Sequence, residues 1–210
     1  MKIVCLFFCL FFLLISCRNT TSENNSIVVD KDSIVSTESD LETTSQDVAT
    51  KPILALTSNA LQLVNKETGS TRELPFSMSE KQILEMITGI IGKSPDAIQI
   101  NEECGAGPLK MASWNNGLTI VFQEEQESQW IFAGWFAEAP SNSAQKITTM
   151  AGIGIGSTRA AMEDAYVVEV FESTLGQEFS TSSGLFGLFD GTSENAKITH
   201  MWSGVSCNFR

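Results

Sequence analysis

The sequence is poor in positive charge and contains almost no histidine. Lys and Arg number 13 against 25 Asp and Glu, so the formal net charge at pH 7 is −12. This deficit of bases excludes nucleic-acid binding, which needs a basic surface. His200 is the sole histidine, and with two cysteines in the folded part it leaves too few ligands for a structural zinc site. We therefore expect no metal, no other cofactor and no nucleic-acid partner.

Long apolar runs are missing beyond the first residues. The chain opens "MKIVCLFFCLFFLLISC", in which Lys2 precedes an apolar run from Ile3 to Ile15. That run is shorter than the roughly 20 residues that span a bilayer. A basic start, a short apolar core and a small residue are typical of a secretory signal. Residues 1–16 are thus predicted to be a signal peptide, and no later segment is apolar enough to cross a membrane.

The end of this segment is more specific. "LISC", Leu14 to Cys17, resembles the bacterial lipobox, in which an aliphatic residue, a tolerant position and a small residue precede the lipidated cysteine. The resemblance implies cleavage before Cys17 and acyl chains such as palmitate on that residue. One acyl chain holds only marginally, whereas several give stable attachment. The expected location is the bacterial cell envelope. An aspartate directly after the lipidated cysteine would imply retention in the inner membrane, and Arg18 at this position favours the outer membrane. An ordinary secretory signal with a chance cysteine is the alternative.

Residues 17–52 contain no aromatic side chain and are rich in Ser, Thr, Asn, Asp and Glu. Such a segment cannot bury enough apolar surface to offset the entropy lost on ordering. It is predicted to be a disordered acidic tether. A sorting signal just after the lipid is the functional alternative to a plain spacer.

Residues 53–210 are predicted to form a single domain, with 18 acidic residues against 9 basic ones. Two cysteines leave with the signal and Cys17 takes the lipid, so Cys104 and Cys207 remain. An exported chain with two remaining cysteines most simply pairs them. Two buried thiols or a shared metal remain as alternatives.

The domain contains an internal match. Two segments align without a gap at a separation of 67 residues, which pairs Gly117 with Gly184, Leu118 with Leu185, Phe122 with Phe189, Ile131 with Ile198 and Trp135 with Trp202. Upstream, at a separation of 79, Ser79 meets Thr158 and Ile83 meets Met162. We therefore predict two degenerate repeats, at about 53–137 and 146–210.

Each repeat contains a short helix followed by strands. In the first, Ser77 or Ser79 can cap a helix with an isoleucine stripe, and Gly92 ends it. The second helix runs from Thr158 to about Tyr166. Around them, "LTIVF" with "WIFAGW", and "LFGLF" with "ITHMWSG", are typical of hairpins, as is "LQLV" with "TRELPF". The expected fold is α+β: two units, each a short helix followed by an antiparallel β-meander, preceded by a β-hairpin.

This layout resembles the tandem units of the beta-lactamase inhibitor protein family. The helix openings "PFSMSEKQIL" and "GIGIGSTRAAME" are also similar to those of the SmpA/OmlA (BamE) type of envelope lipoproteins. The resemblance covers about Leu74 to Ser203. It implies a domain of a kind that presents a sheet face to another protein and is not usually an enzyme.

The glycine-rich stretch "GIGIGSTR", Gly152 to Arg159, raises the question of a phosphate site. It lacks the lysine that a Walker loop needs, and its glycines have the wrong spacing for a dinucleotide fold. We interpret it as a strand with Ile153 and Ile155 on one face, followed by a helix cap. Arg159 is unfavourably placed near a helix start, which indicates an ion pair, with Glu163 or Asp164, or a ligand contact.

Four residues are candidate binding residues: Trp114, Trp130, Arg159 and His200. Trp135 and Trp202 occupy matching repeat positions and are expected in the core, whereas Trp114 and Trp130 have no counterpart and could be anchors on an exposed sheet face. His200 is expected to be a half-exposed strand residue. No recognisable nucleophile accompanies it, so no catalytic residue is predicted.

The sequence thus favours a membrane-anchored envelope lipoprotein that acts as a non-catalytic protein-binding or assembly module. The alternative is a small-molecule-binding protein or hydrolytic enzyme with a pocket between the repeats. A cleft gathering Arg159, His200 and Glu102 would favour that alternative, and an aromatic-lined sheet would favour the binding module.

Overall fold

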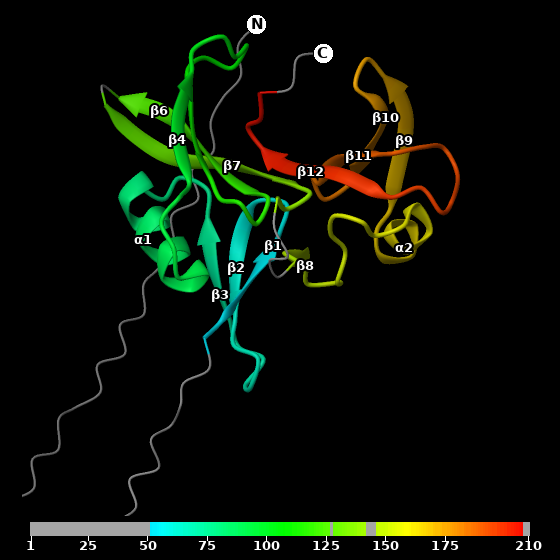
Figure 1. Cartoon of the computed structure of the whole chain (residues 1–210), viewed down its shortest axis with the longest axis horizontal. Coiled ribbons are helices and arrows are strands. Elements are labelled where there is room, and N and C mark those ends of the chain that lie inside the picture. The colour runs from blue at the N-terminus through cyan, green and yellow to red at the C-terminus, as the bar shows by residue number, and fades with distance from the viewer. Residues whose placement is uncertain (1–50, 127, 142–145, 208–210) are drawn as a thin grey trace, which may run out of the picture. The chain divides into compact units, whose positions relative to one another are not determined.

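The computed structural model describes residues 51–126, 128–141 and 146–207 (Figure 1). The predicted signal peptide, Cys17 and the tether up to residue 50 lie outside the described residues. All described residues fall in one compact unit. None of its helices has the length and apolar character needed to cross a membrane.

The fold is α+β, as predicted, and its centre is an eight-stranded antiparallel sheet. The strand order is β4-β5-β6-β7-β12-β11-β10-β9, so two four-stranded meanders join where β7 pairs with β12. The strands are β4 (Ala97–Asn101), β5 (Leu109–Ser113), β6 (Leu118–Gln126), β7 (Gln129–Glu138), β9 (Val168–Ser173), β10 (Gly176–Thr181), β11 (Phe186–Phe189) and β12 (Ile198–Gly204).

A smaller mixed sheet has the order β3-β2-β1-β8. Its strands are β1 (Ile53–Leu56), β2 (Ala60–Val64), β3 (Thr71–Pro75) and β8 (Thr148–Thr149), and β1 pairs with β8 in parallel. The hairpin expected from "LQLV" and "TRELPF" is β2 and β3. The turn between β1 and β2 packs on the middle of the large sheet, where Thr57 accepts a hydrogen bond of 2.8 Å from Trp135 Nε1 and Ser58 accepts one from Ser203 Oγ.

Helix α1 (Glu80–Ile91) has capping residues at both ends and an apolar face that is buried between them. Ser79 is the N-cap, and it forms a capping box with Gln82. Ile83 and Ile87 are fully buried. Gly92 ends the helix in the left-handed conformation, which glycine adopts without steric cost. The prediction for this helix is confirmed, with Ser79 as the cap.

Helix α2 (Arg159–Ala165) is capped at its N-terminus by Thr158, whose side chain accepts a hydrogen bond from Ala161 N. Met162 is its buried residue. The strand interpretation of the preceding glycines was wrong. Residues 152–157 form turns with one isolated bridge at Gly154, because Gly152 and Gly156 both adopt positive φ angles that interrupt an extended strand.

The two hairpins of the match begin alike. Trp114 N donates to Leu118 O and Gly117 N donates to Trp114 O, and the same pattern joins Thr181, Gly184 and Leu185. These contacts are 67 residues apart, as the ungapped match requires.

The returning strands do not keep that separation. Phe122 pairs with Phe132, whereas Phe189 pairs with Ile198, so the second connection is one residue shorter. In consequence Trp135 is equivalent to Met201, and Phe136 is equivalent to Trp202. The predicted equivalence of the two tryptophans was therefore wrong by one residue, and because side chains alternate along a strand they lie on opposite faces of the sheet.

One face of the large sheet is covered by the other elements. The main apolar core joins Ile83 and Met162 of the two helices with Leu61 of the small sheet and with Phe122 and Trp135 of the large one. Figure 1 shows α1, β1 to β3 and α2 along one side of β7 and β12. We call this the helix-covered face, and the other side the open face.

Candidate functional site

The open face carries a row of aromatic side chains across the central strands. Phe136 on β7, Trp202 on β12 and Phe186 on β11 share one cross-strand register. The Phe136 and Trp202 ring centroids are 6.4 Å apart, those of Trp202 and Phe186 are 6.3 Å apart, and both pairs are stacked. None of the three belongs to the core clusters. We call these three residues the aromatic row.

The row is exposed only at its two ends. Trp202 in the middle is buried, at 3% exposure, whereas Phe136 and Phe186 on either side of it are half-buried. Aromatic rings aligned in this way present a rigid apolar surface at a low cost in side-chain entropy. The two phenylalanine rings are the accessible part of this row.

Beside the aromatic row lies a second row that contains His200. His200 pairs across strands with Glu138 on one side and with Leu188 on the other. Its ring lies 5.7 Å from the Phe136 ring, and its Nδ1 is 3.0 Å from Thr199 Oγ1. The expectation of a partly exposed strand residue is confirmed, and its position on the open face makes it part of the same surface.

The other half of the open face is covered by the chain itself. After β12, residues Val205 to Cys207 cross toward β4, and we call this segment the C-terminal strap. Val205 and Cys207 pack against a small cluster of Cys104, Leu109 and Val121. The strap thus covers the part of the open face around Leu109 and Val121 in the first meander, and the aromatic row is not part of this cluster.

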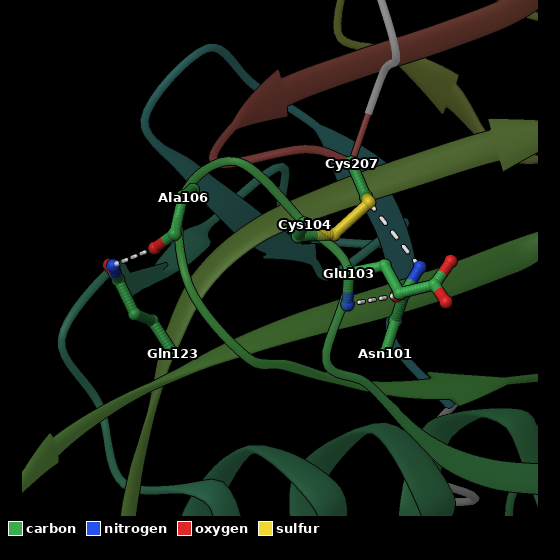
Figure 2. The surroundings of a disulfide bond; sticks show 6 residues. All are labelled: Asn101, Glu103, Cys104, Ala106, Gln123 and Cys207. Carbon is green, nitrogen blue, oxygen red and sulfur yellow. Dashed lines mark hydrogen bonds between the residues drawn. A yellow bond between two sulfur atoms is a disulfide. The ribbon is translucent and has the colours of Figure 1, made fainter.

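A disulfide between Cys104 and Cys207 fixes the strap, as predicted from the cysteine count (Figure 2). The two Cα atoms are 5.4 Å apart. Figure 2 shows the local contacts: Asn101 Nδ2 lies 3.3 Å from Cys207 Sγ, and Gln123 Nε2 donates to Ala106 O at 3.3 Å. The loop before β5 is thereby held against the end of the chain.

The predicted tryptophan anchors lie elsewhere. Trp114 is buried at 4% exposure and donates its ring N–H to Lys93 O at 3.0 Å. Trp130 is half-buried and packs against the main core, with Lys110 Nζ 4.5 Å from its ring centroid. Lys110 also pairs with Glu80 of α1 at 2.8 Å. The idea that both rings stand on an exposed sheet face was therefore wrong, because the helix side of the fold covers them.

Arg159 forms the ion pair that its position indicated. Its Nε lies 2.7 Å from Glu163 Oε1, and its Nη1 donates to Thr192 O at 3.1 Å. The pair spans one turn of α2, so it offsets the unfavourable placement of a cation at a helix start. Arg159 is thus engaged within its own unit, with both side chains of the pair partly exposed.

Arg159, His200 and Glu102 are not gathered into one cleft. Arg159 lies on α2, His200 on the open face, and Glu102 in the exposed loop that follows β4. A small pocket of about 240 Å³ lies between the two repeats, and Gly117, Ala137 and Ile155 are among the residues that line it. Arg159, His200 and Glu102 do not line it. Within residues 51–126, 128–141 and 146–207, no cluster of His, Cys, Asp and Glu could hold a metal ion.

Comparison of the chain with protein-family models, with curated proteins and with solved structures finds no match. Sequence reasoning missed Phe136 and Phe186. A signal was present, since "WIFAGWFAE" and "LFGLF" are apolar at successive positions, and strands covered on both faces have that pattern.

Proposed function

We propose that this chain is a lipid-anchored protein of the bacterial cell envelope, held through Cys17, that binds a protein partner non-catalytically through the open face of its large sheet. The observation that carries the proposal is the aromatic row, Phe136, Trp202 and Phe186, which belongs to neither core cluster. Aromatic anchors at the centre of an interface contribute most of the binding free energy in protein complexes. The outer membrane is the proposed location.

The surroundings of the row favour a partner that carries positive charge. Glu138 and Glu169 are exposed on the same face: Glu138 lies opposite His200 in the adjacent row, and Glu169 lies at the far end of the register that contains the aromatic row. The chain as a whole has a net charge of −12. Complementary charge speeds association and rejects like-charged proteins more than it adds affinity. We therefore expect a folded partner with an apolar patch bordered by lysine or arginine.

Substitution of Phe136 and of Phe186 by alanine tests this surface. Truncating a central aromatic anchor costs about 2 kcal/mol or more, which is roughly thirtyfold in affinity. Proteins captured from envelope extracts by the wild-type chain, and identified by mass spectrometry, should be lost with either variant and weakened by added salt. Ile98→Ala is the matched control, because Ile98 is 52% exposed on the edge strand β4, away from the row. Equal loss with the control, or retention by both phenylalanine variants, contradicts the proposal.

The anchor is tested separately. Cys17→Ser should abolish incorporation of a radiolabelled fatty acid and move the protein from the membrane to the soluble fraction. A wild-type protein that takes up no label, or a serine variant that stays in the membrane, refutes anchoring through Cys17. Neither outcome bears on the sheet surface.

A further inference from the structure

A second surface combines positive charge with an apolar floor. A pocket of about 340 Å³ lies where the chain enters β1, and it shares no residue with the aromatic row. Ligand pockets have volumes of about 300–1,000 Å³, so this one suits a small molecule. Its walls come from the start of β1, the turn after β2, the end of α1, and the segments at Asn116 and at Ile147.

Three lysines surround this pocket: Lys51, Lys66 and Lys146. They come from separate parts of the chain, and they are three of the nine Lys and Arg residues in the described ranges. No acidic residue is among those lining the pocket. The ion pairs found in the described ranges use Lys81, Lys93, Lys110 and Arg159, so the three pocket lysines are not neutralised there.

Two of the three lysines have a neighbour that locates their ammonium group: Lys146 Nζ lies 3.5 Å from the point where a Cβ on Gly156 would stand, and Lys146 also lines the pocket of about 240 Å³. Lys51 Nζ lies 3.6 Å from the point where a Cβ on Gly92 would stand, at the end of α1, and the last turn of that helix has no basic residue. A cation there complements the helix dipole. Lys66 and Lys146 are on other elements, so the dipole does not account for their place at this pocket in a strongly acidic protein.

The floor of the pocket is apolar. Its lining includes Ile53, Ile90, Ile91 and Ile147, all half-buried, and Leu54, which is 9% exposed. Lysine stems can lie along such a floor while their ammonium groups stay in water at the rim. A ligand that satisfies both features carries an apolar chain and a negative head group.

We propose that this pocket binds a single-chain amphiphilic anion, with the alkyl chain on the isoleucine floor and a carboxylate or phosphate among Lys51, Lys66 and Lys146. Lysine binds both head groups as a point charge. The inference goes beyond the proposed function, and the two stand or fall separately because the surfaces share no residue.

The test uses the chain from residue 18 onward, without signal or lipid, because the sheets, the core clusters and the disulfide all lie within residues 51–207. Decanoate and monodecyl phosphate are titrated by calorimetry, and the isoleucine methyl groups are followed by NMR. We expect decanoate, monodecyl phosphate or both to bind. Which of the two binds shows whether the natural head group is a carboxylate or a phosphate. The methyl signals of Ile53, Ile90, Ile91 and Ile147 should shift, and that of Ile98 should not.

The combined variant Lys51→Gln, Lys66→Gln and Lys146→Gln should bind the ligand at least tenfold more weakly. The matched control, Arg72→Gln, Lys81→Gln and Lys197→Gln, removes the same charge from exposed positions outside the pocket and should bind within twofold of wild type. Thermal unfolding confirms that both variants fold.

Several results would overturn the inference. Equal binding of octyl glucoside or decyltrimethylammonium would show that the negative head group is irrelevant. If acetate or inorganic phosphate bound as tightly as the decyl compounds, the alkyl chain would be irrelevant. Absence of binding by both decyl anions, equal loss in the control variant, or methyl shifts at Ile98 in place of the pocket isoleucines would also refute it.

Discussion

Breaking the Cys104–Cys207 disulfide should lower the stability of the folded protein by a large fraction. The bond joins residues 103 positions apart. On the chain-entropy model, a closed loop of about 100 residues removes roughly 4.7 kcal/mol of conformational freedom from the unfolded chain at 25 °C. Domains are typically stable by only about 5–15 kcal/mol, so the loss amounts to a third or more of the total.

The native structure should survive the change. The strap is also held by the hydrogen bond of 2.9 Å from Val205 N to Ala133 O and by packing on Leu109 and Val121, and these contacts do not depend on the bond. Reduction of the wild-type protein removes the bond and keeps both sulfur atoms, whereas Cys104→Ala with Cys207→Ala removes the side chains as well. The reduced protein isolates the loop contribution, and the double variant adds the cost of lost packing.

Urea unfolding followed by tryptophan fluorescence measures both forms against the oxidised protein. We expect a free-energy difference of about 4–5 kcal/mol on reduction. Each single alanine variant should behave like the double variant to within about 1 kcal/mol, since either one breaks the bond. A difference below about 1 kcal/mol on reduction would refute the reasoning, because the unfolded chain would then be restricted by something other than the bond.

Two further predictions concern the helices and one carboxylate. Ile83→Ala and Met162→Ala each remove a fully buried side chain at equivalent helix positions, so each should cost about 2–5 kcal/mol in chemical unfolding, and a change in only one helix would contradict their equivalence. Hydrogen bonds from the Lys93 side chain and the Asn115 backbone hold the pKa of Asp96 below its ordinary value of 3.8. That stabilisation is present above pH 3.8 and is lost as the pH falls through the lowered pKa. Asp96→Asn should therefore reduce the melting temperature at pH 7. The difference in melting temperature between wild type and variant should disappear in acid and persist in base.

Much of the fold could be predicted because its signals are local. Ser79 and Gly92 mark the ends of α1, and the spacing of Ile83 and Ile87 defines its buried face. The α+β class and the disulfide followed from short patterns and from a cysteine count. Strands β4 and β10 were missed. "AIQIN" is short and both of its isoleucines are exposed, "GQEFST" is mostly polar, and both segments are ordered by pairing with their neighbours.

The candidate surface was harder to predict, because it depends on register. An ungapped match placed Trp135 and Trp202 together, yet one missing residue in the second connection sends them to opposite faces of the sheet. A shift of one residue exchanges the faces of a strand, and pattern matching cannot detect it without the turn geometry. Trp114 was misjudged for a related reason, since the hydrogen bond to Lys93 O that keeps it buried joins residues 21 positions apart.

The pairing of β7 with β12 sets Phe136 opposite Trp202, its own counterpart in the other half of the chain. A local two-fold axis therefore passes between these two side chains. In an assembly of two identical subunits, a residue on such an axis must pack against a copy of itself, so its shape cannot change on one side alone. Because both halves here belong to one polypeptide, the contact combines a phenylalanine with a larger tryptophan. The β7–β12 junction is therefore asymmetric in a way that two identical subunits could not be. A bound protein would contact two chemically different halves of this surface and could bind in one orientation only.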